Sequence, residues 1–245
     1  MKVAYISDMH GNLEALSTVF RDIDQRNDIN SICCTGDVVG YYPHPLECID
    51  IIRRRCEHVI KGNHDEVVTD NNFNRQKSWF NPIAAAALTW TREKLLEADA
   101  ATYYHYIESL PVSKEIFIEG RKVLLAHGTP EDKWDYFLFP FWLDNPPPEQ
   151  KVRLGKWLKK WDLVVIGHTH QPFVYKYRKK VVLNPGSVGQ PRDGNPKASY
   201  AIAEINATKI EAEIIRLDYD IKRTCKDLLE ANLHEYLCDR LISGN

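Results

Sequence analysis

Five short apolar runs, each followed by residues able to bind a metal ion, constrain this chain more than any other feature. The runs are Val3–Ile6, Ile32–Cys34, Val59–Ile60, Val123–Ala126 and Leu163–Ile166. Segments with helical periodicity separate the first three runs, so the chain is predicted to open as β-α-β-α-β. In open α/β folds, ligand sites lie beyond the carboxyl ends of the strands. We therefore expect the polar residues after the runs to lie close together.

The second half of the chain indicates a mixed rather than a purely parallel sheet. Three further strand-like runs, Val181–Leu183, Ser199–Glu204 and Lys209–Arg216, are joined by turns that contain asparagine or glycine. Such turns typically join antiparallel strands. Residues 220–243 return to helical spacing and are expected to pack on a sheet face. The predicted fold class is therefore α/β, of the α+β type.

The length and composition are those of one folded domain, which we place at residues 1–245. Residues 73–110 contain no strand-like run and are predicted to be a helical insertion, with Pro82 in the first turn of a helix. Residues 129–149 are predicted to be an aromatic and proline-rich loop, because proline disrupts helices and central strands. Its aromatic residues are Trp134, Tyr136, Phe137, Phe139, Phe141 and Trp142. Both segments are candidates for the contact surface of a homo-oligomer.

Charge and hydropathy exclude several classes of partner. The formal net charge of -2 argues against bulk binding of nucleic acid or of an anionic membrane, because both require a concentrated basic surface. No stretch approaches the roughly 18 consecutive apolar residues of a membrane-spanning helix, so we expect a cytoplasmic protein. The six cysteines lack the spacing of metal-binding pairs and are expected to be free thiols.

Carboxylates and an imidazole follow the first two apolar runs. Asp8 and His10 are two residues apart, so on an extended backbone their side chains point to the same side and can bind one ion. Asp37 follows the second run and is expected at the same edge of the sheet. Taken alone, the spacing of Asp8 and His10 is a weak signal. Asp37 alone has a simpler explanation, since an aspartate in this position also caps helices.

An asparagine and several histidines follow the other three runs. The third run continues into Asn63–Asp65, which offers an amide oxygen, an imidazole and a carboxylate in succession. His127 follows the fourth run, and His168 and His170 follow the fifth. Five of the nine histidines of the chain lie in these motifs. A separate structural role for each histidine would not explain why so many of them follow strand-like runs.

These motifs, in this order, resemble the signature of the calcineurin-like metallophosphoesterase superfamily. The resemblance extends from Asp8 to His170, and the later run Asn184–Ser187 resembles a segment of the small bacterial and archaeal phosphodiesterase branch. It implies a four-layer architecture in which helices flank a mixed two-sheet β-sandwich. It also implies a hydrolase that acts on phosphoric ester bonds.

The resemblance implies a centre with two divalent metal ions. One ion would be held by Asp8, His10, Asp37 and His170, and the second by Asp37, Asn63, His127 and His168. Asp37 would bridge the two ions, because closely spaced cations need an anionic ligand between them. Nitrogen and oxygen ligands without thiolate suit Mn²⁺, Fe, Zn²⁺, Ni²⁺ and Co²⁺, and do not decide among them. We favour Mn²⁺.

The reaction implied by the resemblance is the attack of a metal-bridging hydroxide on phosphorus. His64 would be the general acid that protonates the leaving oxygen, with a packing role as the alternative. Asp65 would assist catalysis by orienting the His64 imidazole, although a helix cap explains this carboxylate nearly as well.

The expected substrate is a small-molecule phosphate ester or nucleotide, and we favour a phosphodiester. Ser/Thr protein phosphatases continue their Gly-Asp motif with Asp-Arg-Gly, whereas this chain has Val38–Tyr42 and lacks that phosphate-gripping arginine. The same absence weakens the case for a dinucleotide polyphosphatase, unless Arg192 supplies a cation from another loop. A phosphomonoesterase, a dinucleotide polyphosphatase and a protein phosphatase-like enzyme stay open as alternatives.

Two functions from other classes compete with an enzyme. One is a noncatalytic scaffold on the same fold, as in a retromer subunit that resembles these enzymes but has lost part of the catalytic set. This chain retains every ligand and His64, which favours catalysis. The other is a nucleic-acid-binding module, which would need interleaved basic and aromatic residues that the sequence lacks.

Overall fold

Two five-stranded sheets face each other in the computed structural model of the chain, which describes residues 1–136, 138–143 and 145–245. The first sheet has the strand order β10 (Ile210–Leu217), β9 (Ala198–Ile205), β1 (Lys2–Ile6), β2 (Ser31–Cys34) and β3 (His58–Val59). Strands β1, β2 and β3 are parallel, whereas β9 is antiparallel to both β1 and β10. The predicted β-α-β-α-β opening is therefore confirmed.

The second sheet is also mixed. Its strand order is β4 (Ser113–Ile118), β5 (Arg121–Ala126), β6 (Leu163–Val165), β8 (Lys180–Asn184) and β7 (Phe173–Tyr177). Strands β5, β6 and β8 are parallel, and β4 and β7 pair antiparallel at the two edges. The strand expected at 181–183 thus belongs to this sheet, while the two later strands complete the first sheet.

Side chains from both sheets fill the space between them. On β1, Val3 points into this space and Ala4 points outward against the helices, as the alternation of a strand requires. From the second sheet, Leu125 and Leu183 join Val3 in one buried cluster. The two sheets therefore form a sandwich with a shared apolar core.

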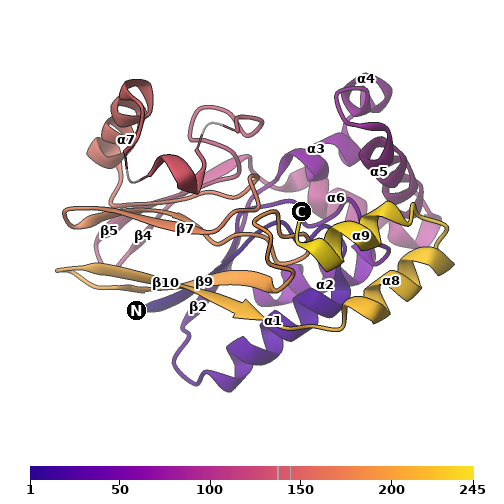
Figure 1. Ribbon diagram of the computed structural model, residues 1–245, viewed down its shortest axis with the longest axis horizontal. Helices are drawn as coiled ribbons and strands as arrows, with labels where there is room; N and C mark the ends of the chain where they lie inside the picture. The colour runs from indigo at the N-terminus through magenta and orange to yellow at the C-terminus, as the bar shows by residue number, and fades with distance from the viewer. Residues whose placement is uncertain (137, 144) are drawn as a thin grey trace.

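Helices cover both outer faces of the sandwich. Helices α1 (Leu13–Gln25) and α2 (Pro45–Arg55) pack on the first sheet, and α7 (Pro148–Lys160) packs on the second. Figure 1 shows these layers, with α7 above the sheets and α1 below them. The predicted fold class, a mixed two-sheet sandwich flanked by helices in four layers, is confirmed.

The segments predicted as an insertion and a loop lie between the strands that build the sandwich. After α3 (Asn63–Thr69), residues 73–110 form α4 (Phe73–Lys77), α5 (Pro82–Leu95), the 3-10 turn Ala98–Ala100 and α6 (Ala101–Ser109). Within residues 129–149, the described part forms the 3-10 turn Pro140–Trp142 and the first residues of α7. Phe137, one of the aromatic residues of this segment, and Asp144 lie outside the described residues.

The C-terminal segment does not pack on a sheet face, so this expectation was wrong. It forms α8 (Ile221–Glu230) and α9 (Tyr236–Ser243). Leu237 of α9 belongs instead to a buried cluster that includes Tyr42 and Ala84 of α5. The reason is that α1 and α2 already cover the outer face of the first sheet.

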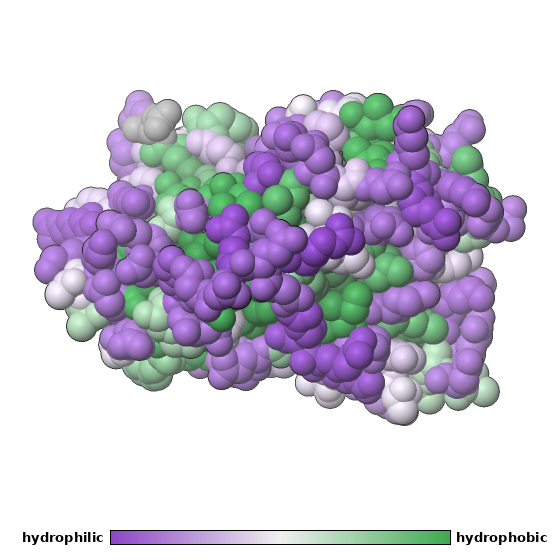
Figure 2. Space-filling view, turned by 90° about the horizontal axis from the view of Figure 1, so that it is seen from below, coloured by the Kyte–Doolittle hydropathy of each residue, from purple (hydrophilic) through white to green (hydrophobic). Residues whose placement is uncertain are grey.

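The membrane-spanning potential, the surface and the cysteines complete the description of the fold. None of the described helices is long and apolar enough to cross a membrane. Hydrophilic side chains cover most of the face seen in Figure 2, with smaller hydrophobic areas between them. The six cysteines are free, as the sequence predicted.

The packing between the sheets can be tested by truncating one side chain. Leu125 is fully buried there, whereas Phe117 on the neighbouring strand β4 is 73% exposed. We expect Leu125→Ala to lower the free energy of unfolding by about 3 kcal/mol, because the truncation leaves a cavity. Phe117→Ala, the control, should lower it by less than about 1 kcal/mol. Urea unfolding followed by circular dichroism measures both values, and equal losses would contradict the packing described.

Candidate metal centre

The loops that carry the candidate ligands meet at one end of the sandwich and hold one another in place. The backbone N–H of His10 donates a hydrogen bond to the carbonyl oxygen of Asp37 at 2.9 Å. On the second sheet, the N–H of Gly167 donates to the carbonyl oxygen of His127 at 2.7 Å. The relative positions of the side chains on these loops are therefore fixed by backbone contacts.

Most of the candidate ligands have a left-handed backbone conformation. Among the described residues, eight non-glycine residues have a positive φ. Five of these are Asp8 (57°), His10 (52°), Asp37 (53°), His168 (66°) and His170 (58°). This conformation is strained for a residue with a Cβ atom and persists only where the surroundings impose it, often at functional sites.

The first group of converging side chains consists of Asp8, His10, Asp37 and His170, all of them buried. The Nε2 atoms of His10 and His170 are 3.1 Å apart, and Nε2 of His170 is 3.3 Å from a carboxylate oxygen of Asp8. The ligand atoms of the group all lie within 4.8 Å of one another. They are close enough to bind a single ion.

The second group consists of Asp37, His127 and His168, and its ligand atoms also lie within 4.8 Å of one another. Nε2 of His127 is 3.3 Å from a carboxylate oxygen of Asp37 and 3.0 Å from Oδ1 of Asn63. The structure therefore brings together all seven side chains that the sequence singled out as ligands. Asp37 belongs to both groups.

Hydrogen bonds on the outer side of the histidine rings orient them. Each of three Nδ1 atoms bonds a backbone carbonyl oxygen: His10 that of Val39, His127 that of Thr35 and His170 that of Gln190. Nε2 of each ring therefore faces the other ligands, where it can bind a metal ion once it carries no proton. Within the described residues the buried Nε2 of His168 has no hydrogen-bond partner, so its lone pair is available to a metal ion. The donor set suits divalent ions that accept nitrogen and oxygen ligands.

The protonation states of the buried groups also suit metal binding. Burial would raise the pKa values of Asp8 and Asp37, but the neighbouring histidines lower them below the ordinary range. Burial lowers the pKa of His168 to about 3. Ionised carboxylates and neutral imidazoles are the forms that bind metal. In His127 burial is outweighed by Asp37 and Asp8, which raise its pKa to about 9, so this ring carries a proton that a cation can replace.

His64 lies beside the two groups and belongs to neither. The centroid of its ring is 4.6 Å from that of His10 and 4.8 Å from that of Tyr41. Its Nδ1 atom is buried and has no hydrogen-bond partner in the part of the chain that the structure describes. Burial lowers the pKa of His64 to about 4, against the opposing effect of Asp37. The ring is therefore close to the centre and has one nitrogen available for an additional hydrogen bond.

Asp65 is held by the backbone rather than by the His64 ring. Its carboxylate oxygens accept hydrogen bonds from the N–H groups of Val39 (3.1 Å) and Gly62 (3.0 Å). Asp65 thus occupies the helix-capping arrangement at the start of α3 and joins this helix to the loop after β2. Burial and the charge of Asp37 raise the pKa of Asp65 to about 6.

The run Asn184–Ser187, to which the sequence assigned no role, supports the ligand loops of both sheets. Ser187 Oγ donates a hydrogen bond to the carbonyl oxygen of Asp8 at 2.7 Å. Asn184 Nδ2 donates to the carbonyl oxygen of Gly167 at 2.9 Å. The resemblance of this run to a family segment was the one signal of its role, because the residues it supports lie far away in the sequence.

Arg192 and Tyr136 also lie next to the centre. Nη2 of Arg192 donates to Tyr41 Oη (3.3 Å) and to Gln190 Oε1 (3.0 Å). Its Nε is buried and has no hydrogen-bond partner among residues 1–136, 138–143 and 145–245. The ring of Tyr136 packs on that of His168, with 3.8 Å between the centroids. The sequence offered Arg192 as an open question and Tyr136 only as part of an aromatic loop. Their placement beside the ligands comes from the fold.

Comparisons with known proteins agree with this geometry. The model of the calcineurin-like phosphoesterase superfamily domain matches residues 1–208. The uncharacterized protein MJ0912 of Methanocaldococcus jannaschii is 37% identical, over 99% of this chain and 98% of its own length. Phosphodiesterase YfcE of Escherichia coli K12 is 24% identical, over 86% of this chain and 92% of its own length.

A solved structure shows the same architecture. The crystal structure of a metallophosphoesterase from Sphaerobacter thermophilus has a TM-score of 0.77 to this chain at 30% sequence identity. The match covers 100% of this chain and 99% of the other. The chain therefore shares its fold with a metallophosphoesterase along its whole length.

Gly62 offers a test that separates the centre from the rest of the fold. A Cβ atom on Gly62 would lie 2.0 Å from Oδ1 of Asp37, so Gly62→Ala must displace this carboxylate. A Cβ atom on Gly155 in α7 would meet no atom of the described residues within 4 Å, which makes Gly155→Ala the control. Mn²⁺ at about 100 times its Kd should stabilise the wild type and the control by about 2.7 kcal/mol.

For Gly62→Ala we expect the stabilisation by Mn²⁺ to fall below about 1 kcal/mol, because the displaced Asp37 carboxylate is a ligand in both groups. Thermal unfolding with and without Mn²⁺ gives the values. Equal stabilisation of the two variants would contradict the geometry described around Asp37.

Proposed function

Because this chain belongs to the calcineurin-like phosphoesterase superfamily and is a hydrolase of phosphoric ester bonds, we propose that it cleaves phosphodiesters at a centre of two divalent metal ions. The observation that carries the proposal is the shared carboxylate, since Asp37 belongs to both groups of buried ligands. A site for a single ion would need only one such group.

We assign the ligands as two sets. One ion is held by Asp8, His10, Asp37 and His170, and the other by Asp37, Asn63, His127 and His168. When bound, two such ions lower the pKa of water and neutralise charge on the phosphoryl oxygens. The carboxylate of Asp37 reduces the repulsion between the cations, and His127 gives up its proton when it becomes a ligand. We propose Mn²⁺ as the first choice among the metals that suit these donors.

His64 is the proposed proton donor to the leaving oxygen. Without substrate its pKa is lowered to about 4 by burial, so the ring is neutral near pH 7. A phosphate ester beside the ring adds negative charge, which favours the protonated imidazole. We propose that His64 takes up its proton together with the substrate and passes it to the leaving group. Asp65 contributes by fixing the start of α3, and hence the position of His64, through its bonds to Val39 and Gly62.

Arg192 is the proposed additional contact of the protein with the phosphoryl group. It lies on the loop after β8 and interacts electrostatically with His64 and His170. Its Nε makes no hydrogen bond to any described residue. A guanidinium in this position can bind a phosphoryl oxygen through its N–H groups. It would take the place of the arginine that the sequence lacks after Asp37.

A diester is preferred because one relative bears the name of a phosphodiesterase. Monoesters and dinucleotide polyphosphates are the alternatives within the enzyme class. We also propose that residues 1–245 act as a single domain in the cytoplasm. A noncatalytic scaffold is the alternative from another class, and the presence of both ligand groups together with His64 argues against it.

Two variants test the assignment of the ligands and of the proton donor. Asp37→Asn should lose metal and activity together, because a neutral amide cannot offset the repulsion between two cations. His64→Ala should keep its metal and lose about 10²- to 10⁴-fold in turnover, most severely for poor leaving groups. Parallel assays of mono- and diesters with Mn²⁺, Ni²⁺, Mg²⁺ and Zn²⁺, with metal content measured separately, give both results.

The outcomes of this experiment differ in meaning. Full loss of metal from His64→Ala would refute the role of that residue. No turnover of any ester by the wild type with any of these metals would refute the proposed function.

A third variant tests Arg192. We expect Arg192→Gln to lower kcat/KM by about 10²-fold, the usual effect of losing one donor to the reacting group. Arg54→Gln is the matched control, because Arg54 is 64% exposed on α2 and pairs with Asp50. Steady-state kinetics with bis(p-nitrophenyl) phosphate measures both changes. An unchanged kcat/KM for Arg192→Gln would remove this residue from the proposed phosphoryl contacts.

A further inference from the structure

A cavity of about 530 Å³ borders Tyr41, the residue whose ring packs against the metal centre. We call it the Tyr41 cavity, and its lining includes Tyr41, Pro82, Ile83, Tyr236, Leu237 and Arg240. The centroid of the Tyr41 ring is 4.7 Å from that of His10 and 4.8 Å from that of His64. The cavity and the candidate metal centre therefore share one side chain as a wall.

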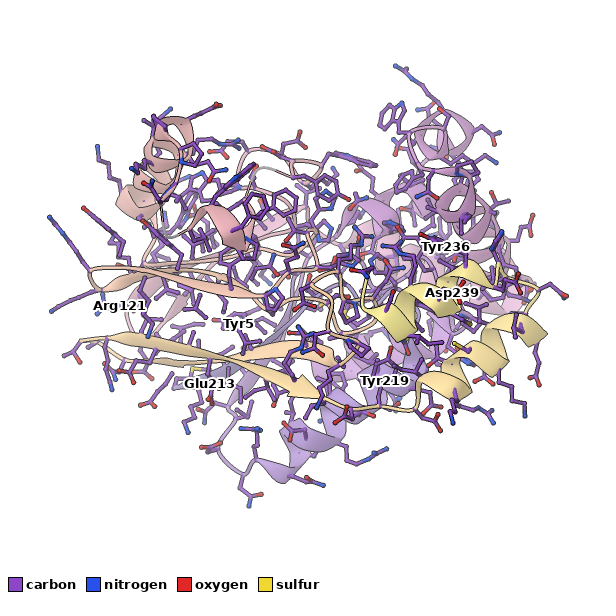
Figure 3. All side chains as sticks on the ribbon, in the orientation of Figure 1. Tyr5, Arg121, Glu213, Tyr219, Tyr236 and Asp239 are labelled. Carbon is purple, nitrogen blue, oxygen red and sulfur yellow. The ribbon has the colours of Figure 1, made fainter. Side chains whose placement is uncertain are left out.

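Three separate parts of the chain build the Tyr41 cavity. Tyr41 lies on the loop after β2, Ile83 lies at the start of α5, and Tyr236 and Arg240 lie on α9. Figure 1 shows α9, in yellow, beside α5 and the strand-end loops, and Figure 3 labels Tyr236 on the same helix. Because α9 lies beyond the residues matched by the family model, 1–208, part of the cavity is outside the common domain.

The helices around the Tyr41 cavity are firmly held. Tyr42 Oη donates a hydrogen bond to the carbonyl oxygen of Leu237 at 3.3 Å. Tyr42 and Leu237 also pack in one buried cluster with Ala84 of α5. The loop after β2, α5 and α9 are thus tied together, so the cavity has a fixed shape rather than a surface that can close freely.

The lining of the Tyr41 cavity combines flat and apolar surfaces with one guanidinium. Pro82, Ile83 and Leu237 provide aliphatic surface, and Tyr236, which is 49% exposed, adds an aromatic ring. Arg240 lies 5.9 Å from the Tyr41 ring centroid, and its Nε donates to the carbonyl oxygen of Asn245 at 2.7 Å. Among the described residues, its terminal nitrogens have no hydrogen-bond partner, so they are available to a ligand.

We propose that the Tyr41 cavity binds the nucleoside part of a nucleotide substrate, an inference that rests on the proposed function. The aliphatic and aromatic walls match the faces of a base, and the N–H groups of Arg240 match the acceptor atoms on its edge. The volume lies within the range of about 300 to 1,000 Å³ that is usual for small-molecule sites. Since His64 packs against Tyr41, the proposed proton donor lies next to one wall of the cavity.

The test compares two ligands that share a sugar phosphate and differ in the base. Adenosine 5′-monophosphate and ribose 5-phosphate are titrated into the Mn²⁺-loaded protein by calorimetry, so that the ratio of affinities isolates the base. In the wild type we expect the nucleotide to bind at least about tenfold more tightly, as stacking of one base contributes in other proteins.

Two variants locate this preference in the Tyr41 cavity. Ile83→Trp fills the cavity and should bring the affinity ratio close to one. Arg240→Gln removes the donor to the base edge and should lower the ratio by about fivefold. Val152→Trp is the control for the added ring, because Val152 is 58% exposed on α7, away from the cavity lining, and it should leave the ratio unchanged.

The experiment distinguishes an error in the cavity proposal from an error in the proposed function. Equal affinities in the wild type, or a preference for the nucleotide that survives in Ile83→Trp and in Arg240→Gln, would overturn the cavity proposal even if ester hydrolysis is observed. A preference that disappears in these variants supports the cavity, and it does so even if no ester is hydrolysed and the proposed function fails.

Discussion

The carboxylate of Asp37 is buried where the loops of the two sheets meet, and the arrangement of the centre follows from the need to compensate its charge. An uncompensated buried charge carries a large free-energy penalty. One Asp37 oxygen accepts a hydrogen bond from the backbone N–H of His64 at 2.8 Å, and the other lies 3.3 Å from Nε2 of His127. These partners come from different loops and different sheets. The charge is therefore tolerated only when the whole sandwich has brought the loops together, which couples the chemistry of the centre to the completeness of the fold.

The same convergence explains why glycine stands next to the ligands in the sequence. A Cβ atom on Gly36 would lie 2.4 Å from the backbone nitrogen of Gly62, so the loops after β2 and β3 approach one another as closely as backbone allows. Gly36 also has a φ of 95°, which a residue with a side chain adopts only with strain. The Gly-Asp and Gly-Asn pairs of the motifs thus reflect two requirements at once. The polar residue supplies the ligand, and the glycine supplies the space in which the neighbouring loop must lie.

The sequence was sufficient for the features that depend on local pattern. Buried strands are recognisable in the sequence as apolar runs. The residues after these runs could be named as ligands because the carboxyl ends of parallel strands meet at one edge of a sheet. The edge strands β4 and β7 went unnoticed because only Ile116 and Ile118 on β4, and Phe173 on β7, are buried, which leaves little apolar signal. The role of Asp65 could not be decided, since capping a helix and orienting an imidazole place the same carboxylate at the same position in the sequence. The packing of α9 depends on which surfaces other helices have already covered, and that is a property of the folded chain.

A metal centre of this kind binds the phosphoryl group, which every phosphate ester possesses, so it cannot by itself distinguish one ester from another. Discrimination requires contacts with the remainder of the substrate. In this chain the ligands lie on loops that the strands hold rigidly, whereas Tyr136 and Arg240 reach the surroundings of the centre from segments outside those loops. A change in one of these segments can alter which ester fits without moving Asp37 or the histidines. The fold therefore separates the residues that would perform the reaction from those that would select its substrate, and Tyr41, which touches both His64 and Arg240, is the point at which the two sets meet.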